Sequence, residues 1–358
     1  MREGCTALVA LIALAACAGV PDALGGEGRP ITEEPVSFGS GGLTPPIAVP
    51  PFDGESLALW ARTEPGTCFA VDTLEAGGRA VVSRRVAGPY CSDCAVRASF
   101  AEVEALFVFP RDQGFDPSAG LALRFGLMRC DTLTPLDEAR AALELAWLPR
   151  ETIPARGRVS LRFLIADHAS LHGRPDLSRA LVGALNAELE GTGLEVTLEG
   201  VVELPDAPRE ATFSTTELDE LEPLLAGAPP APRFTVDVVV AACLRYDDPF
   251  FGPPVAVEGF TPRVLGGAGP ASAVFLPALR CDAPSPRAVE PDAHVLAHEL
   301  GHFLGLYHSV EADGTTDLLS DTDEANTMHH TPALARSRGF SPSQARHMRA
   351  HPWVHPLP

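Results

Sequence analysis

Short apolar runs broken by Gly and Pro characterise the chain between residues 56 and 150. Runs of this length that end at turn residues predict β-strands. A longer stretch rich in Ala and Leu, 136–148, predicts one closing helix. Residues 56–150 are therefore predicted to form a small β-rich domain of unknown role. A cover for an active site, a substrate-binding module and a structural spacer are all open roles. The apolar runs begin at Leu57, Ala80, Ala105 and Leu121.

The pattern changes after a composition shift over 149–157. Residues 176–190 carry apolar side chains on one helical face, and Gly191 and Gly193 end the helix. Around this helix lie runs whose length and β-branched content predict buried strands. This order predicts an α/β (α+β) domain over 155–358, with a helix laid on one face of a twisted mixed sheet. The strands are predicted at 159–166, 194–204, 234–242 and 273–276.

The N-terminus has the pattern of an export signal. Arg2 precedes an apolar run over 6–16, which is too short to span a bilayer but suits the apolar core of a signal peptide. The run ends in small residues followed by Cys17, and in this it resembles a bacterial lipoprotein signal. The resemblance implies cleavage before Cys17, lipidation of its sulfur and attachment to a membrane of the bacterial cell envelope. A plain secretory peptide is the alternative.

Two further features of the chain follow from composition. Residues 18–55 are rich in Gly and Pro without an apolar period, which predicts a flexible tether after the signal at 1–17. The formal net charge is −20, from 47 acidic and 27 basic residues, and all of the basic residues are Arg. Such an acidic surface repels nucleic acid, so no nucleic-acid partner is expected.

Six cysteines follow the signal and tether, and an even number in an exported chain favours disulfides. We expect the first four to pair within the β-rich domain and the last two to pair with each other. Zinc binding or redox exchange by the C-x-x-C pair is the alternative. The six are Cys68, Cys91, Cys94, Cys130, Cys243 and Cys281.

Histidine is concentrated in HVLAHELGHFLGLYH, residues 294–308. Pro291 suits a first helical turn, and the segment after it continues as a helix to Leu304. His298 and His302 are one turn apart on one face, so both imidazoles can reach one ion. Gly305 stands where a left-handed residue would end the helix and return His308 to the same ion. Three neutral imidazoles predict a zinc site of the catalytic kind.

Glu299 follows the first of these histidines and would project beside the metal. There it can take a proton from water, which is the general-base role of the H-E-x-x-H pattern.

The full pattern, HExxHxxGxxH, resembles that of the metzincin metallopeptidases. The resemblance implies a methionine turn beneath the metal, which we place at Met328, and a C-terminal helix. Ser341, Pro342 and Gln344 predict the start of such a helix, which runs to about residue 350. The linking stretch 313–323 looks like the pappalysin branch and related bacterial lipoproteins, whereas Ser309 directly after the third histidine is matrixin-like.

Weaker candidates surround the motif. The acidic residues at 313–323 are candidate Ca²⁺ ligands, and a solvated loop is the alternative. His329 and His330 are either oxyanion-stabilising or ordinary surface residues, and His294 either flanks the site or is structural. The acidic residues are Asp313, Asp317, Asp321 and Asp323.

The resemblance implies an exported zinc metalloendopeptidase that cleaves protein or peptide substrates. Substrate backbone would add as a strand near 273–276. A zinc-binding surface lipoprotein without peptidase activity and an unrelated zinc hydrolase are the alternatives.

Overall fold

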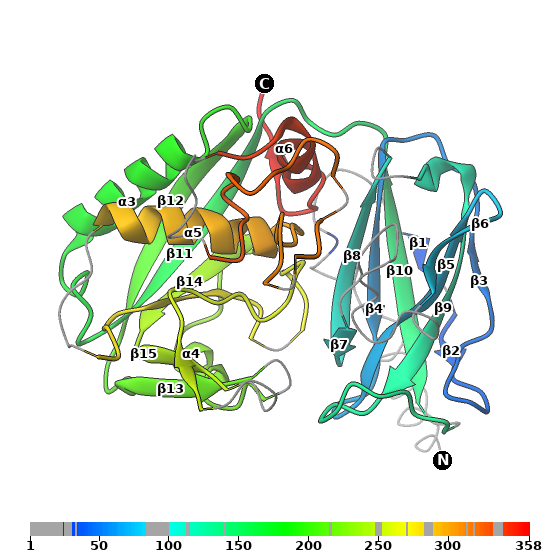
Figure 1. The fold of residues 1–358 in the computed structure, drawn as a ribbon, viewed down its shortest axis with the longest axis horizontal. Helices are drawn as coiled ribbons and strands as arrows, with labels where there is room; N and C mark the ends of the chain where they lie inside the picture. Colours follow the sequence, from blue (N-terminus) through cyan, green and yellow to red (C-terminus); the bar gives the residue numbers. More distant parts are fainter. Residues whose placement is uncertain are drawn as a thin grey trace, which may run out of the picture.

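The computed structural model of the protein (Figure 1) describes most of the chain. The described residues are Leu24, 31–32, 34–83, 100–111, 115–138, 141–214, 217–247, 253–269, 271–282, 289–312, 314–317, 319–331 and 339–358. Among them, no helix is both long enough and apolar enough to cross a membrane.

Two antiparallel sheets pack on each other in the first part of the chain. One has the strand order β1-β10-β4-β8, with β2 also paired to β10, and the other has the order β3-β9-β5-β6, with β7 also paired to β5. Leu57, Phe69, Phe125 and Trp147 lie in the core between the sheets. The predicted β-rich domain is therefore a sandwich. Its strands are β1 (Ile31–Thr32), β2 (Val36–Ser37), β3 (Ile47–Val49), β4 (Ser56–Arg62), β5 (Cys68–Ala76), β6 (Arg79–Ser83), β7 (Phe100–Glu102), β8 (Glu104–Pro110), β9 (Leu121–Met128) and β10 (Ala142–Arg150), with a short 3₁₀ turn at Pro117–Ala119.

The prediction of a flexible tether over 18–55 is wrong for residues 31–49. These residues supply β1, β2 and β3, and Phe38 and Ile47 are buried in the sandwich core. Close packing requires one of the glycines here, because a Cβ on Gly42 would stand 1.7 Å from the carbonyl oxygen of Leu136. Within 18–30, only Leu24 is among the described residues.

The helix predicted at 136–148 is also wrong. Residues Ala142–Arg150 form strand β10, which pairs antiparallel with β4 from Glu144 opposite Arg62 to Arg150 opposite Ser56. Leu143, Leu145 and Trp147 face the sandwich core, whereas Ala146 and Leu148 face the second part of the chain. Both faces of the strand are buried, so its sequence lacks the alternation that would have identified it.

The second part of the chain is built on a mixed sheet. Strands β12, β11, β14 and β17 are parallel in that order, and β18 pairs antiparallel with the start of β11. Helices α3 and α5 lie side by side across one face (Figure 1), where Leu185 and Leu296 pack against Phe163. The elements are β11 (Gly157–Ala166), α3 (Pro175–Glu188), β12 (Leu194–Leu204), β14 (Thr235–Ala241), β17 (Val274–Pro277), α5 (Val289–Phe303), α6 (Pro342–Arg349) and β18 (His355–Pro356).

The opposite face of this sheet is covered by elements that the sequence pattern did not reveal. A small sheet of order β13-β15-β16 and the short helix α4 pack against Leu164, Val239 and Phe275. These elements are β13 (Glu210–Phe213), α4 (Glu222–Ala226), β15 (Cys243–Tyr246) and β16 (Val255–Ala256).

Two disulfides are present among the described residues. Cys68 is bonded to Cys130 within the sandwich, and Cys243 is bonded to Cys281 in the second part of the chain. The predicted Cys243–Cys281 pair is therefore confirmed. Cys17, Cys91 and Cys94 lie outside the described residues.

The two parts of the chain share a buried contact. Trp60, Leu106 and Leu148 from the sandwich form one apolar cluster with Ala268 and Ala350 from the second part. Beside this cluster, the buried Arg150 donates to the carbonyl oxygens of Ala350 and His351, each at 3.0 Å. The end of α6 is thus capped by a residue from the sandwich, as cations favour the C-terminal end of a helix.

Candidate metal centre

Helix α5 ends in a turn that only glycine suits. Gly305 has φ +104°, and its N–H donates to the carbonyl oxygen of His302, while the N–H of Leu306 donates to that of Gly301. This is the Schellman arrangement, in which a left-handed residue closes the helix. A Cβ at position 305 would also approach Nε2 of His347 to 2.6 Å. The chain therefore reverses here as predicted, and the segment that carries His308 runs back towards the helix.

The three predicted ligands come together in space. Nε2 of His302 lies 3.1 Å from Nε2 of His298 and 3.2 Å from Nε2 of His308, and His298 is 2% exposed. Ligand nitrogens at 2.0–2.1 Å from a tetrahedral zinc ion would stand about 3.3 Å apart. Among the described residues these three form a possible metal-binding group.

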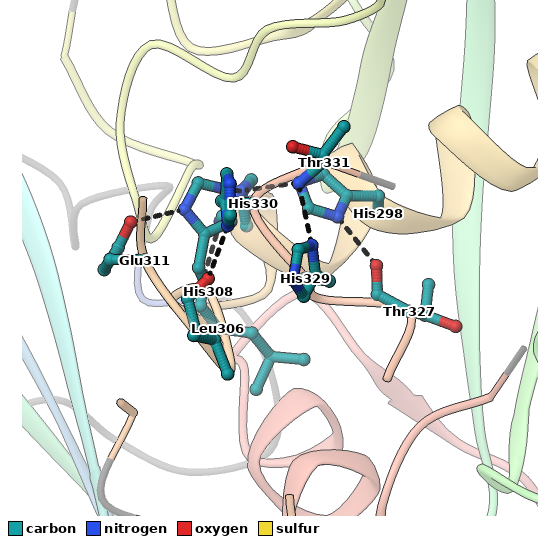
Figure 2. A network of polar contacts seen from close by, with 10 residues as sticks. His298, Leu306, His308, Glu311, Thr327, His329, His330 and Thr331 are labelled. Atoms are coloured by element: carbon teal, nitrogen blue, oxygen red, sulfur yellow. Dashed lines mark hydrogen bonds and ion pairs between the residues drawn. The ribbon is translucent and has the colours of Figure 1, made fainter. Parts of the chain in front are cut away.

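Each imidazole is oriented through its other nitrogen (Figure 2). Nδ1 of His298 donates to the carbonyl oxygen of Thr327 at 2.8 Å, and Nδ1 of His302 donates to that of Leu306 at 2.7 Å. Nδ1 of His308 donates to Oε2 of Glu311, also at 2.7 Å. A neutral imidazole with its proton on Nδ1 has a lone pair on Nε2. Three lone pairs thus face one another, which is an arrangement that a cation stabilises.

The protonation state suits metal binding as well. Burial lowers the pKa of His298 well below its ordinary value and lowers the pKa of His302 to about 3. Both rings are therefore neutral at neutral pH, and neutral imidazole is the form that binds a metal. The donor set and its geometry fit Zn²⁺.

Glu299 is held by the segment before β17. Oγ1 of Thr261 donates to Oε2 of Glu299 at 2.8 Å, and a Cβ on Gly259 would stand 2.7 Å from Cγ of Glu299. Burial raises the pKa of Glu299 to about 8. A cation at the histidines would favour the ionised carboxylate, so metal binding would oppose this shift.

Met328 lies against the same helix. A Cβ on Gly301, between the two helical histidines, would stand 2.5 Å from the Met328 sulfur, and Met328 is fully buried. Its carbonyl oxygen accepts from the N–H of Ser309 at 2.8 Å. Its own N–H donates to Oδ1 of Asn326 at 2.8 Å. The turn at 326–328 thus contacts the helix below the histidines and the segment that bears His308, which is where the sequence predicted a methionine turn.

Comparison with known proteins supports the interpretation of this segment. Residues 283–340 match the model of peptidase family M43, described as pregnancy-associated plasma protein-A. Over this segment the chain is similar to that family of metallopeptidases, and the segment contains the three histidines and Met328. The match favours the pappalysin resemblance over the matrixin one. A search of curated proteins found no match.

Two solved metallopeptidase structures are similar at low identity. Archaemetzincin from Methanopyrus kandleri is 17% identical, with 54% of this chain and 95% of that chain covered and a TM-score of 0.35. Metalloproteinase-II from Bacteroides fragilis is 14% identical, with 55% of this chain and 54% of that chain covered and a TM-score of 0.34. Both TM-scores are low, so the similarity to metallopeptidases rests on the matched segment 283–340 and its histidines.

The described aspartates between His308 and Met328 are engaged in turns and caps. Asp321 accepts from Oγ of Ser341 and from the N–H of Ser343 at the start of α6. Asp317 accepts from Oγ1 of Thr322 and from the N–H of Leu319. In the same way, Oδ1 of Asp323 accepts from the N–H of Ala325. The described carboxylates thus give no support for a calcium site, and Asp313 lies outside the described residues.

The three weaker histidine candidates, His294, His329 and His330, each have a different hydrogen-bond partner. Nδ1 of His294 donates to Oε2 of Glu188 at the end of α3, at 3.0 Å. His330 donates from Nδ1 to the carbonyl oxygen of Val310 at 3.1 Å, and its ring lies 6.4 Å from that of His308. Nδ1 of His329 accepts from the N–H of Thr331. His294 is thus a link between the two helices that cover the sheet.

The sheet edge expected to receive substrate is already partly paired. Phe275 in β17 exchanges both backbone hydrogen bonds with Phe260, each at 2.9 Å. The expectation of an open edge at 273–276 is therefore wrong at this position. Phe260 therefore lies at the outer edge of β17. Its two neighbours in the chain, Gly259 and Thr261, lie against Glu299.

Four groups that orient the site residues were not identified from the sequence: Glu311, Thr261 and the carbonyl oxygens of Leu306 and Thr327. Glu311 is near His308 along the chain, and that spacing is the only sequence signal for it. Thr261 reaches Glu299 from a distant segment, and a backbone carbonyl carries no signal in the sequence.

Proposed function

We propose that this protein is an exported, membrane-anchored zinc metalloendopeptidase in which Glu299 is the general base. The observation that carries the proposal is the convergence of Nε2 of His298, His302 and His308 at 3.1 and 3.2 Å. A Zn²⁺ ion bound there supplies Lewis-acid polarisation of a carbonyl group and lowers the pKa of water towards about 7.

Glu299 has the surroundings that a base of this kind needs. Oγ1 of Thr261 donates to Oε2 of the carboxylate at 2.8 Å. Oε1 is therefore the oxygen that would accept the proton. Because the side chain is only 5% exposed, bulk water does not weaken its interaction with the reacting groups. The same oxygen then delivers the proton to the leaving amine, so one residue serves first as base and then as acid.

The segment around Phe260 is the proposed place for the substrate backbone. Phe260 uses one edge of its backbone to bond Phe275, and a peptide that adds as a strand would lie along the other. A peptide bound along that edge would have its scissile bond near Gly259 and Thr261, which lie against Glu299. The substrate class is therefore an extended protein or peptide segment.

Replacing Glu299 tests the proposal directly. The Glu299→Gln variant keeps the side-chain volume and the contact with Thr261 but removes the base. We expect cleavage of a denatured-protein or peptide-library substrate to fall by roughly 10²–10⁴-fold, while bound zinc stays equal to that of the parent. Glu324→Gln, a change at an exposed carboxylate, is the matched control and should cleave normally.

Two outcomes would favour the alternatives. Equal cleavage by the parent and Glu299→Gln would show that the activity, if any, does not use this base. Zinc binding without cleavage of any peptide would favour a surface lipoprotein that binds its partner without hydrolysis.

Membrane attachment through Cys17 is a separate part of the proposal. It is supported by the apolar run at 6–16 and the small residues before Cys17. Expressed in a bacterium with its signal, the parent should partition into the detergent phase, and Cys17→Ser should partition into the aqueous phase. Mass spectrometry of the N-terminal peptide should show diacylglyceryl modification of Cys17. An unmodified N-terminus beyond residue 17 would instead indicate plain secretion.

A further inference from the structure

The three zinc-ligand candidates differ in what orients them. Nδ1 of His298 and of His302 each donate to a backbone carbonyl oxygen. Nδ1 of His308 donates to a carboxylate, Oε2 of Glu311, at 2.7 Å. Figure 2 shows this carboxylate directed at the imidazole. The third ligand is thus the one among the three whose orientation depends on a charged side chain, and that side chain can be changed by mutation.

His308 also has the least support from secondary structure. His298 and His302 lie on α5, whose backbone hydrogen bonds fix their Cα positions. His308 lies in a loop beyond Gly305, and its side chain is 24% exposed. A loop ligand needs its ring plane and tautomer set by a partner, because the backbone alone leaves the side-chain torsions undetermined.

The turn that carries Glu311 is held by main-chain hydrogen bonds. The N–H of Glu311 donates to the carbonyl oxygen of Thr315 at 2.7 Å, and the N–H of Gly314 donates to the carbonyl oxygen of Glu311 at 2.9 Å. Next to it, Val310 bridges both Thr316 and His329. These main-chain bonds do not involve the side chain at position 311. A substitution there should therefore change the contact with His308 and leave the turn in place.

We infer that Glu311 is the positioning residue for the third metal ligand and raises the affinity of the site for zinc. The inference rests on the proposed zinc site. The carboxylate keeps the proton of His308 on Nδ1 and so directs Nε2 at the ion. Its negative charge also offsets part of the charge of a divalent cation that three neutral imidazoles leave uncompensated. The carbonyl oxygens that hold the other two ligands bring dipoles without a net charge.

The test measures zinc binding by the full chain, with Zn²⁺ alone as the probe. Equilibrium competition with a chromophoric chelator gives the dissociation constant for the parent, Glu311→Gln and Glu311→Ala. We expect Glu311→Ala to weaken binding about 10–100-fold. Glu311→Gln should weaken it less, because the carboxamide oxygen still accepts from Nδ1 of His308. Glu324→Gln, in the same acidic stretch of the chain, should bind like the parent.

A second readout separates positioning from a merely structural role. The melting temperature of the zinc-loaded protein should fall in the order parent, Gln, Ala, and by more than the melting temperature of the metal-free protein falls in the same series. Equal zinc affinity for Glu311→Ala and the parent would overturn the inference, and so would an equal loss of stability with and without metal. Should the Ala variant not fold, a parent-like affinity of Glu311→Gln would overturn it.

These outcomes are distinct from failure of the proposed peptidase. A parent chain that binds zinc and shows the expected series but cleaves no peptide would contradict the peptidase and leave the role of Glu311 intact. Cleavage by the parent together with unchanged zinc affinity in Glu311→Ala would support the peptidase and contradict the role of Glu311. A parent chain that binds no zinc would overturn both.

Discussion

Gly301 and the sulfur of Met328 are packed so closely that position 301, directly before His302, has no room for a side chain. A Cβ on Gly301 would lie 2.5 Å from the Met328 sulfur. The glycine at the fourth position of the H-E-x-x-H pattern is therefore required by the turn that packs against the helix.

This contact predicts that Gly301→Ala lowers the free energy of unfolding by roughly 1–3 kcal/mol, because overpacking outweighs the gain in helix propensity. Gly183→Ala is the control, since a Cβ there, on α3, meets nothing within 4 Å. That change should stabilise by up to about 1 kcal/mol. Urea denaturation of the metal-free protein measures both. Equal stability of the two variants would contradict the packing argument.

The contact of Arg150 with the end of α6 predicts that the stability of the second part of the chain depends on the sandwich. Its guanidinium, 6% exposed, donates to carbonyl oxygens at the end of α6. Arg150→Ala leaves these buried carbonyls without their cation and should cost roughly 2–4 kcal/mol of unfolding free energy. Arg129→Ala, which breaks an exposed pair with Asp131, should have little effect on the same thermal or chemical unfolding curve. A loss no larger than that of the control would show that α6 does not need the cap.

Two buried histidines of the C-terminal segment predict acid sensitivity. Burial lowers the pKa of His347 to about 4 and that of His351 to about 3, from an ordinary 6.5. Below pH 6.5 the unfolded chain binds protons that the folded chain excludes, so stability falls as the pH drops from about 6.5 towards 4. The slope is about 1.4 kcal/mol per pH unit for each group. His347→Gln should flatten the slope in metal-free protein between pH 6.5 and 5. An unchanged slope would assign the acid sensitivity to other groups.

Metal removal should lower the melting temperature, and zinc should restore it. Ligand that binds only the folded state stabilises by about 2.7 kcal/mol at a free concentration of 100 times its dissociation constant. Ca²⁺ should have no such effect, because three imidazole nitrogens do not suit a cation that prefers oxygen ligands. Differential scanning calorimetry with a chelator and then with each ion is the measurement. His302→Asn, which removes one ligand, should abolish the response to zinc. A Ca²⁺-dependent rise would revive the calcium site.

The errors in the fold prediction have one physical origin. Strand β10 has apolar residues on both faces because Ala146 and Leu148 meet the second part of the chain while Trp147 fills the sandwich core. Its local sequence therefore matches a helix as well as a strand. Gly42 likewise suggested flexibility, although its lack of a side chain serves close packing against Leu136. Neither partner surface can be read from the segment itself.

The sequence alone determined what depends on near neighbours in the chain. One helical turn separates His298 from His302, a glycine turn brings back His308, and Ser341 with Gln344 starts α6 through a capping box. Backbone geometry fixes these relationships, so spacing is enough to predict them. Only the tertiary structure decided which distant groups complete the site. Thr261 meets Glu299 and Thr327 meets His298 because the sheet and the turn pack around α5, and such contacts depend on three-dimensional packing and not on sequence spacing.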